Sequence, residues 1–301
     1  MPLWGLLLCF VIATLWAASP LMVSRGQKLS QCTANEINPI RSLSFFAAAL
    51  VFTIVYTGGH ITALTSPSVF LYLFINVLLS YIVGDILYFM AIKEIGISLA
   101  VPVSNTHPML VALSSWLILG EKITAAGISG IAVVMCGLLL LRFGGSKGAH
   151  EDDSVRIGSM STSRIMRGFL MSIGAAVSWA LSAPLLKLAM VNSGLGAVEV
   201  TFYRAFIFLI LAWGVRFSVA RHRPGAVRPF ASLKRVTIFY FLGAAFIGLW
   251  LGSVLHAICI SQIPVAVVTA ITSTSPFMAA LFGHFALKER LTRLQWAGVA
   301  M

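Results

Sequence analysis

The sequence predicts an all-α integral membrane protein of ten transmembrane helices, arranged as two five-helix inverted repeats. Of its 301 residues, 59% are hydrophobic and only 10% are charged, whereas an ordinary soluble domain carries about 25% charged residues. The mean hydropathy is +0.95. Apolar runs near the ~20 residues that span a bilayer follow one another along the whole chain. The same polar, proline-containing pattern interrupts two of these runs in corresponding positions.

The first half is expected to contain five spans, because each is an apolar run bounded by polar or turn-forming residues. The predicted helices cover residues 3–23, 40–56, 69–92, 97–119 and 125–143. No basic residue precedes the first run, as one would in a signal peptide, so we expect a retained helix. Residues 1–143 then form the first repeat, and the polar composition of 144–167 predicts a flexible linker.

The second repeat is expected to occupy residues 168–301. Its predicted helices cover 168–190, 198–219, 236–260 and 263–287. A tenth apolar stretch begins near Leu294 and reaches Met301 after about two turns, too few to cross a bilayer. The last helix of this repeat is therefore expected to be incomplete.

The two halves share a constant register. Trp16 corresponds to Trp179 and Arg41 to Arg204, both 163 residues apart; from Gly84 onward the spacing is 168 residues. Residues 84–124 and 252–292 share 11 identities over 41 positions, including the interrupting prolines 108 and 276. Since five spans is an odd number, the second repeat must enter the membrane upside down, the plan of many transporters.

The net charge of +12 does not indicate nucleic-acid binding, because the Lys and Arg residues lie in the short connections between apolar runs. They concentrate after the first, third, fifth, seventh and ninth spans. By the positive-inside rule these connections are cytoplasmic, which places the N-terminus outside. The bias follows the predicted inversion, since the connection after the second span has no basic residue while its counterpart after the seventh has six.

A family resemblance rests on matched motifs in the two halves: Leu15-Trp16, Ser178-Trp179-Ala180, and the residues LGEKIT (119–124) and LKERLT (287–292). With these the chain resembles, over essentially its whole length, the EamA-type ten-helix proteins of the drug/metabolite transporter superfamily. The resemblance implies a secondary transporter in a bacterial inner membrane, often an exporter of amino acids, metabolites or drugs. It also implies a central cavity lined by helices 1, 3 and 4 and their repeats. Three departures are the incomplete last helix, the long connection after the first helix, and the acid Asp85.

Polar residues at the two interruptions are the main substrate-binding candidates, because proline frees a backbone carbonyl there that must be satisfied away from lipid. Aromatic and histidine residues of neighbouring spans join them. The candidate set is Ser104, Asn105, His107, Thr272, Ser273, Ser275, Trp16, Trp179, Tyr88 and His256. Asn105 and Ser273 are equivalent in the two repeats and are expected to face the site. The structural alternatives are hydrogen bonds between helices and an aromatic belt at the membrane surface.

Asp85 is the coupling candidate, since an ionisable residue at membrane depth is a functional hypothesis by default. Proton exchange with a nearby histidine would be one role; a structural pair with an arginine is the alternative. Glu121 is expected to favour the N-terminus of the helix that follows it. Arg41, Arg204 and Lys187 are expected to extend from helix ends towards the membrane surface and not to bind the substrate.

The sequence contains no P-loop, HExxH motif or nucleophile elbow, and its four cysteines form no metal-ligand spacing. We therefore expect no enzyme activity, cofactor or metal. The expected partners are a small-molecule substrate and the lipid bilayer; proton coupling is left open, as is the choice between monomer and homodimer. Alternatives are a flippase of a lipid-linked intermediate, which needs a cavity open to lipid, and a membrane-embedded lipid enzyme, which needs clustered acids or histidines. A non-transporting subunit would not need matched polar segments.

Overall fold

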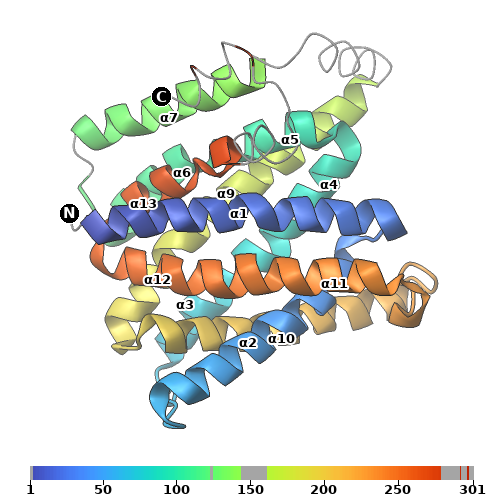
Figure 1. The fold of residues 1–301 in the computed structure, drawn as a ribbon, viewed down its shortest axis with the longest axis horizontal. Helices are drawn as coiled ribbons and strands as arrows, with labels where there is room; N and C mark the ends of the chain where they lie inside the picture. The colour runs from blue at the N-terminus through green and yellow to red at the C-terminus, as the bar shows by residue number, and fades with distance from the viewer. Residues whose placement is uncertain (1–2, 123–124, 144–160, 279–291, 293–296, 298–301) are drawn as a thin grey trace.

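The chain folds into a bundle of helices that share one general direction (Figure 1). The computed structural model describes residues 3–122, 125–143, 161–278, 292 and 297. Within these ranges all regular structure is helical. Six helices are long and apolar enough to cross a membrane, and two shorter apolar helices cover His107–Leu119 and Val265–Met278. The predicted all-α membrane fold is confirmed. The predicted tenth helix and the end of the ninth lie outside the described residues.

The first half contains α1 (Leu3–Ser30), α2 (Ala34–Thr57), α3 (Pro67–Val77), the π-helix η1 (Leu78–Gly84), α4 (Asp85–Ile95), α5 (Ile97–Ser104), α6 (His107–Leu119) and α7 (Ala125–Phe143). Helix α2 begins six residues before the predicted start at 40. The reason is a capping box, in which the backbone N–H of Thr33 donates to the carboxylate of Glu36 at 2.8 Å. Such a cap satisfies N–H groups that the first turn leaves unpaired.

The second half contains α9 (Thr162–Ser193), α10 (Ala197–His222), the short 3₁₀ helix η2 (Phe230–Ser232), α11 (Arg235–Ala244), the π-helix η3 (Ala245–Leu251), α12 (Gly252–Gln262) and α13 (Val265–Thr272). Helix α9 starts at Thr162, ahead of the predicted start at 168. The side chain of Ser161 accepts a hydrogen bond from the backbone N–H of Arg164 and caps this helix. Because the first turn of α9 is polar and is stabilised by this cap, the apolar run alone does not predict it.

Each half interrupts its helices twice. The predicted break at Pro108 is present, since α5 ends at Ser104 and α6 begins at His107. In the second half α13 ends at Thr272, just before the equivalent proline at 276. The π-helices η1 and η3 occupy equivalent places within the long spans Pro67–Ile95 and Arg235–Gln262. Such π segments widen the hydrogen-bonding pattern and are frequent at functional sites.

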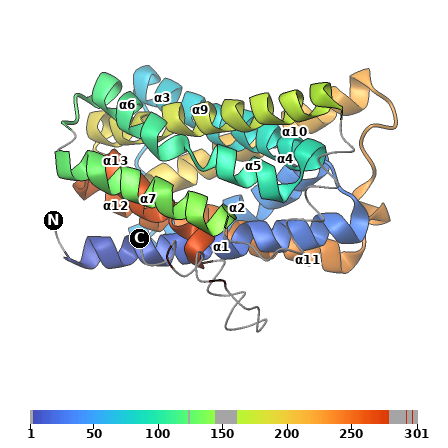
Figure 2. The ribbon, with the colours of Figure 1, turned by 90° about the horizontal axis from the view of Figure 1, so that it is seen from above.

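The two halves interleave rather than forming separate bundles. Helix α1 packs along α11, η3 and α12 of the second half, while α9 packs along α3, η1, α4 and α6 of the first. In the view of Figure 2 α1 and α9 lie on opposite sides of the bundle. The main apolar core draws on both halves: Phe45 and Tyr81 pack with Phe208 and Leu249. The interface between the halves is thus the centre of the molecule.

Ion pairs join the two halves at one end of the bundle, at the right of Figure 1. The guanidinium of Arg228, between α10 and α11, donates to the carboxylate of Glu36 at 2.9 Å. Arg164, at the start of α9, lies 3.3 Å from Glu94 near the end of α4. Four of the connections that the sequence predicts to share one membrane face are therefore joined in pairs here.

The opposite end of the bundle is held by Glu121. Its carboxylate lies 2.7 Å from the ammonium of Lys187 and accepts the backbone N–H of Val265 at 3.0 Å. The carboxylate therefore caps α13 of the other half, whereas the start of the helix that follows Glu121 lies partly outside the described residues. The ammonium of Lys187 is held by this carboxylate and by the carbonyl of Ile263. These contacts tie α6, α9 and α13 together.

Candidate functional site

A crossed pair of tryptophan contacts marks the middle of the interface between the halves. The indole N–H of Trp16, on α1, donates to the carbonyl of Gly248 in η3 at 3.1 Å. The indole N–H of Trp179, on α9, donates to the carbonyl of Ser80 in η1, also at 3.1 Å. Residues 80 and 248 are equivalent in the two repeats, as are the tryptophans. Each first helix therefore supplies the hydrogen bond that a π-helical carbonyl of the other half accepts.

Two glycines allow these indoles to approach. A Cβ on Gly252 would lie 2.6 Å from the indole nitrogen of Trp16, and a Cβ on Gly84 would lie 2.5 Å from that of Trp179. Both separations are far below a van der Waals contact, so only glycine fits at either position. The matched glycines, at the junctions of π-helix and α-helix, are thus part of the same construction.

The aromatic and histidine candidates converge on these tryptophans. The ring of Trp16 lies 5.3 Å from that of His256, and the ring of Trp179 lies 5.2 Å from that of Tyr88, centroid to centroid. His107 meets Trp179 edge to face at 5.9 Å, and His256 is within electrostatic reach of His107. Three other residues proposed from the sequence therefore lie around the two tryptophans, and each indole bonds to a carbonyl of the other half.

The interruption in the first half leaves one polar side chain free. The hydroxyl of Ser104 is buried and donates to the carbonyl of Ser172 on α9 at 3.4 Å. The Nδ1 atom of His107 lies 3.2 Å from the carbonyl of Ser104, so its N–H donates to that carbonyl. Asn105 stands in the turn between α5 and α6 and is half-buried. Its amide has no hydrogen-bond partner in the described part of the chain.

The interruption in the second half is more fully satisfied. The hydroxyl of Thr272 donates to the carbonyl of Val268 at 2.9 Å, and that of Ser273 donates to the carbonyl of Thr269 at 2.6 Å. Both residues are buried. Ser275 is half-buried, and no hydrogen bond of its hydroxyl occurs among the described residues. The pattern favours Asn105 and Ser275 as groups available to a ligand, and Ser273 as a group occupied by its own helix.

Asp85 forms a buried ion pair. Its carboxylate lies 2.8 Å from Nη1 of Arg41, with the side chains 13% and 7% exposed, respectively. The same nitrogen of Arg41 donates to the amide oxygen of Asn38 at 3.2 Å. The pair links α2 to α4 within the first half. Of the two roles left open for Asp85, the structural arginine pair is therefore present, and Arg41 does not extend to the membrane surface as predicted.

The sequence analysis missed a second buried arginine. Arg204, on α10, is 5% exposed, which contradicts the prediction that it extends to the membrane surface. Its Nε donates to the amide oxygen of Asn76 at 2.8 Å, and its Nη2 to the phenol oxygen of Tyr81 at 2.6 Å. The hydroxyls of Tyr81 and Ser253 share a further hydrogen bond of 2.9 Å. An arginine seven residues inside a span was the available signal, since such residues are functional hypotheses by default.

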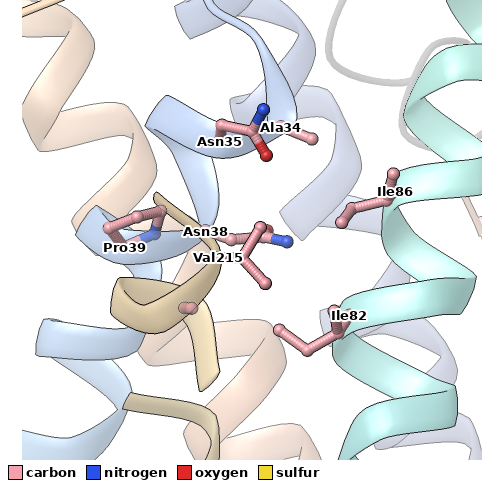
Figure 3. A pocket seen from close by; sticks show the side chains of 8 residues that line it. Ala34, Asn35, Asn38, Pro39, Ile82, Ile86 and Val215 are labelled. Atoms are coloured by element: carbon pink, nitrogen blue, oxygen red, sulfur yellow. The ribbon is translucent and has the colours of Figure 1, made fainter. Parts of the chain in front are cut away.

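A small pocket lies between α2, α10 and the span that contains η1 and α4 (Figure 3). It is lined by Ala34, Asn35, Asn38, Pro39, Ile82, Ile86, Ala212 and Val215. The amide of Asn38 donates to the carbonyl of Tyr81 at 3.2 Å and thereby ties the wall of the pocket to η1. The cavity volume of about 10 Å³ is room for roughly one water molecule. An organic solute would need the halves to move apart.

Comparison with known proteins matches this architecture. The profile of the EamA-like transporter family covers residues 3–143 and 166–301, one copy for each half. A protein of Archaeoglobus fulgidus described as an uncharacterized transporter is 28% identical over 295 residues, which is 98% of this chain and 93% of that protein. A solved crystal structure of a protein with 16% identity covers 100% of this chain and 94% of its own, with a TM-score of 0.74. It shares the fold. The chain is a multi-pass membrane protein that belongs to the EamA-like transporter family.

Proposed function

We propose that this protein is a secondary transporter that exports small organic solutes. Its two five-helix repeats, inverted with respect to each other, would rock around a central site to give alternating access. The observation that carries the proposal is the crossed pair of contacts from Trp16 to Gly248 and from Trp179 to Ser80. The site candidates lie where the two repeats meet, so a motion of one repeat against the other changes their surroundings.

Contacts at both ends of the bundle support this mechanism. The pair of Arg228 and Glu36 joins the halves at one end, and the pair of Lys187 and Glu121 joins them at the other. Opening the bundle at either end requires one of these pairs to separate while the other stays closed. A transporter that exposes its site alternately to the two sides needs two such closures.

The site we propose includes the free amide of Asn105 and the hydroxyl of Ser275, facing the cluster of Trp16, Trp179 and His256. A neutral amide and hydroxyl can hold the polar part of a solute without the desolvation cost of a buried ion. The aromatic rings supply apolar contact area and a specific geometry for the rest of the solute. The combination fits a small amphiphilic molecule.

The test compares small molecules in the medium of cells that overexpress the protein with those of cells that lack its gene. We expect a small set of organic solutes to accumulate outside the overexpressing cells. Asn105→Ala should reduce that export severalfold without lowering membrane abundance, because the amide holds no other part of the protein. Asn192→Ala is the matched control, since Asn192 is exposed at the end of α9. Unchanged media, or equal effects of the two variants, would contradict the proposal.

A further inference from the structure

Arg204 is a buried cation that has no negatively charged partner among the described residues. The guanidinium is buried in the core of the bundle, and its two partners, Asn76 and Tyr81, are both neutral. Its third nitrogen, Nη1, is buried without any hydrogen-bond partner. Among the described residues no carboxylate pairs with it, although five ion pairs occur elsewhere. A buried charge without a countercharge costs several kcal/mol, so this arrangement calls for an explanation.

The equivalent arginine in the first half has the carboxylate partner that Arg204 lacks. Arg41 and Arg204 are equivalent in the repeats, and Arg41 is neutralised by Asp85 at 2.8 Å. The residue equivalent to Asp85 in the second half is Ser253. Ser253 and Arg204 hydrogen-bond to the same phenol oxygen of Tyr81, so Ser253 stands where a countercharge would be expected. The second half therefore keeps the arginine of the pair and lacks its acid.

We propose that Arg204 binds the carboxylate of the transported solute through Nη1. The inference rests on the proposed function and adds the class of substrate, a solute that bears a carboxylate. Arginine suits this task because it stays charged and its N–H groups match carboxylate oxygens. A single negative charge balances the guanidinium, which favours a carboxylate over a doubly charged phosphate ester. Since Nε and Nη2 are already occupied, the carboxylate is held from one side of the guanidinium.

The surroundings of Arg204 fit such a ligand. Tyr81 links the guanidinium to Ser253 on α12, and His256 lies three residues further along that helix, where its ring contacts Trp16. The guanidinium carbon lies 5.0 Å from the centre of the Tyr81 ring, and this contact orients the guanidinium group. A solute that places its carboxylate on Arg204 therefore meets the aromatic cluster with the remainder of its structure. The arginine and the tryptophan site are thus linked by residues of η1 and α12.

The experiment uses the purified full-length protein and matched pairs of solutes that differ only in charge: leucine with leucinamide, pyruvate with pyruvamide, and benzoate with benzamide. Thermal stabilisation and tryptophan fluorescence report binding. At least one carboxylate should bind about tenfold or more tightly than its amide, the worth of a hydrogen bond to a charged group. Glycerol 3-phosphate serves as the phosphate probe and should bind more weakly than that carboxylate.

Two variants test the residue itself. Arg204→Gln should abolish the preference for carboxylate over amide. Ser253→Asp should do the same while keeping or raising thermal stability, because it restores the acid of the Arg41–Asp85 pair and competes with the ligand. Ser253→Asn, of nearly equal volume but neutral, should retain the preference. The second variant keeps the test decisive even if Arg204→Gln fails to fold.

The inference is overturned if no carboxylate of the panel binds better than its amide, if the phosphate ester binds more tightly, or if Ser253→Asp leaves the preference intact. It is also overturned if the exported solutes prove to lack a carboxylate, a result that would leave the transporter function standing. Failure of the function itself looks different, because then no solute of any charge accumulates outside the cells.

Discussion

Replacement of Asp85 by asparagine should destabilise the protein, because it leaves Arg41 charged and buried. The carboxylate and guanidinium are 2.8 Å apart and their side chains are 13% and 7% exposed. Removing one partner of such a pair costs about 3–5 kcal/mol. The lower end applies here, since the amide of asparagine still accepts a hydrogen bond and Asn38 still accepts another from Nη1. At about 2 °C per kcal/mol for a chain of this size, we expect a fall in Tm of about 6 °C.

The assay is thermal unfolding of the purified protein in one detergent, run beside the double variant Arg41→Met, Asp85→Asn. The double variant should recover most of the lost Tm, because removing both charges of a buried pair is often nearly neutral. A different result would refute the structural role of Asp85. If Asp85→Asn keeps its Tm within about 1 °C and instead removes the pH dependence of transport, Asp85 is the coupling residue predicted from the sequence.

Two further predictions concern packing and reactivity. In thermal unfolding, Gly252→Ala should cost about 1–3 kcal/mol of stability, because its Cβ would lie 2.6 Å from the indole nitrogen of Trp16. Gly214→Ala is the control and should cost little, because a Cβ there meets nothing within 4 Å. Burial, and next the charge of the neighbouring Glu36, raise the pKa of the Cys32 thiol to about 11. Its thiolate fraction at pH 8 is then about a hundredfold below that of a free thiol. Because Cys136 is exposed, the test uses a variant that keeps Cys32 and replaces the other three cysteines by serine; maleimide should label this variant slowly when it is folded and fast when it is unfolded. Fast labelling of the folded protein would contradict the buried placement.

Much of the fold follows from run length and register. Apolar runs of about 20 residues become helices because a chain in lipid must satisfy its backbone internally, and the interruption at Pro108 follows from its missing N–H. The register of the repeats also predicted equivalent places for Trp16 and Trp179, which donate to equivalent carbonyls in the opposite halves. The positions of Tyr88 and His256 beside these tryptophans follow from the same register.

What the sequence did not reveal depends on contacts between distant segments. The polar residues that start α2 and α9 are stabilised by caps, which hydropathy does not detect. The π-helices η1 and η3 differ from α-helices in their backbone hydrogen-bonding pattern, which the spacing of apolar residues does not predict. The contacts of Glu121 with Lys187 and Val265 could not be predicted, because both partners lie in the other half. Arg204 was predicted to reach the membrane surface because the sequence shows its place near a helix end but not the neighbouring helices that bury it.

The central claim, transport by alternating access at the interface of the repeats, is tested most directly by solute exchange in proteoliposomes that contain only the purified protein. The measurement is uptake of a labelled solute, identified from the export experiment, into vesicles with and without the unlabelled solute inside. Alternating access predicts saturable uptake that is faster when unlabelled solute is present inside the vesicles. With solute on both sides the transporter can return to the outer side loaded, and it need not reorient while its site is empty. Uptake that rises linearly with concentration and ignores the internal solute, or movement of lipid without movement of solute, would contradict it.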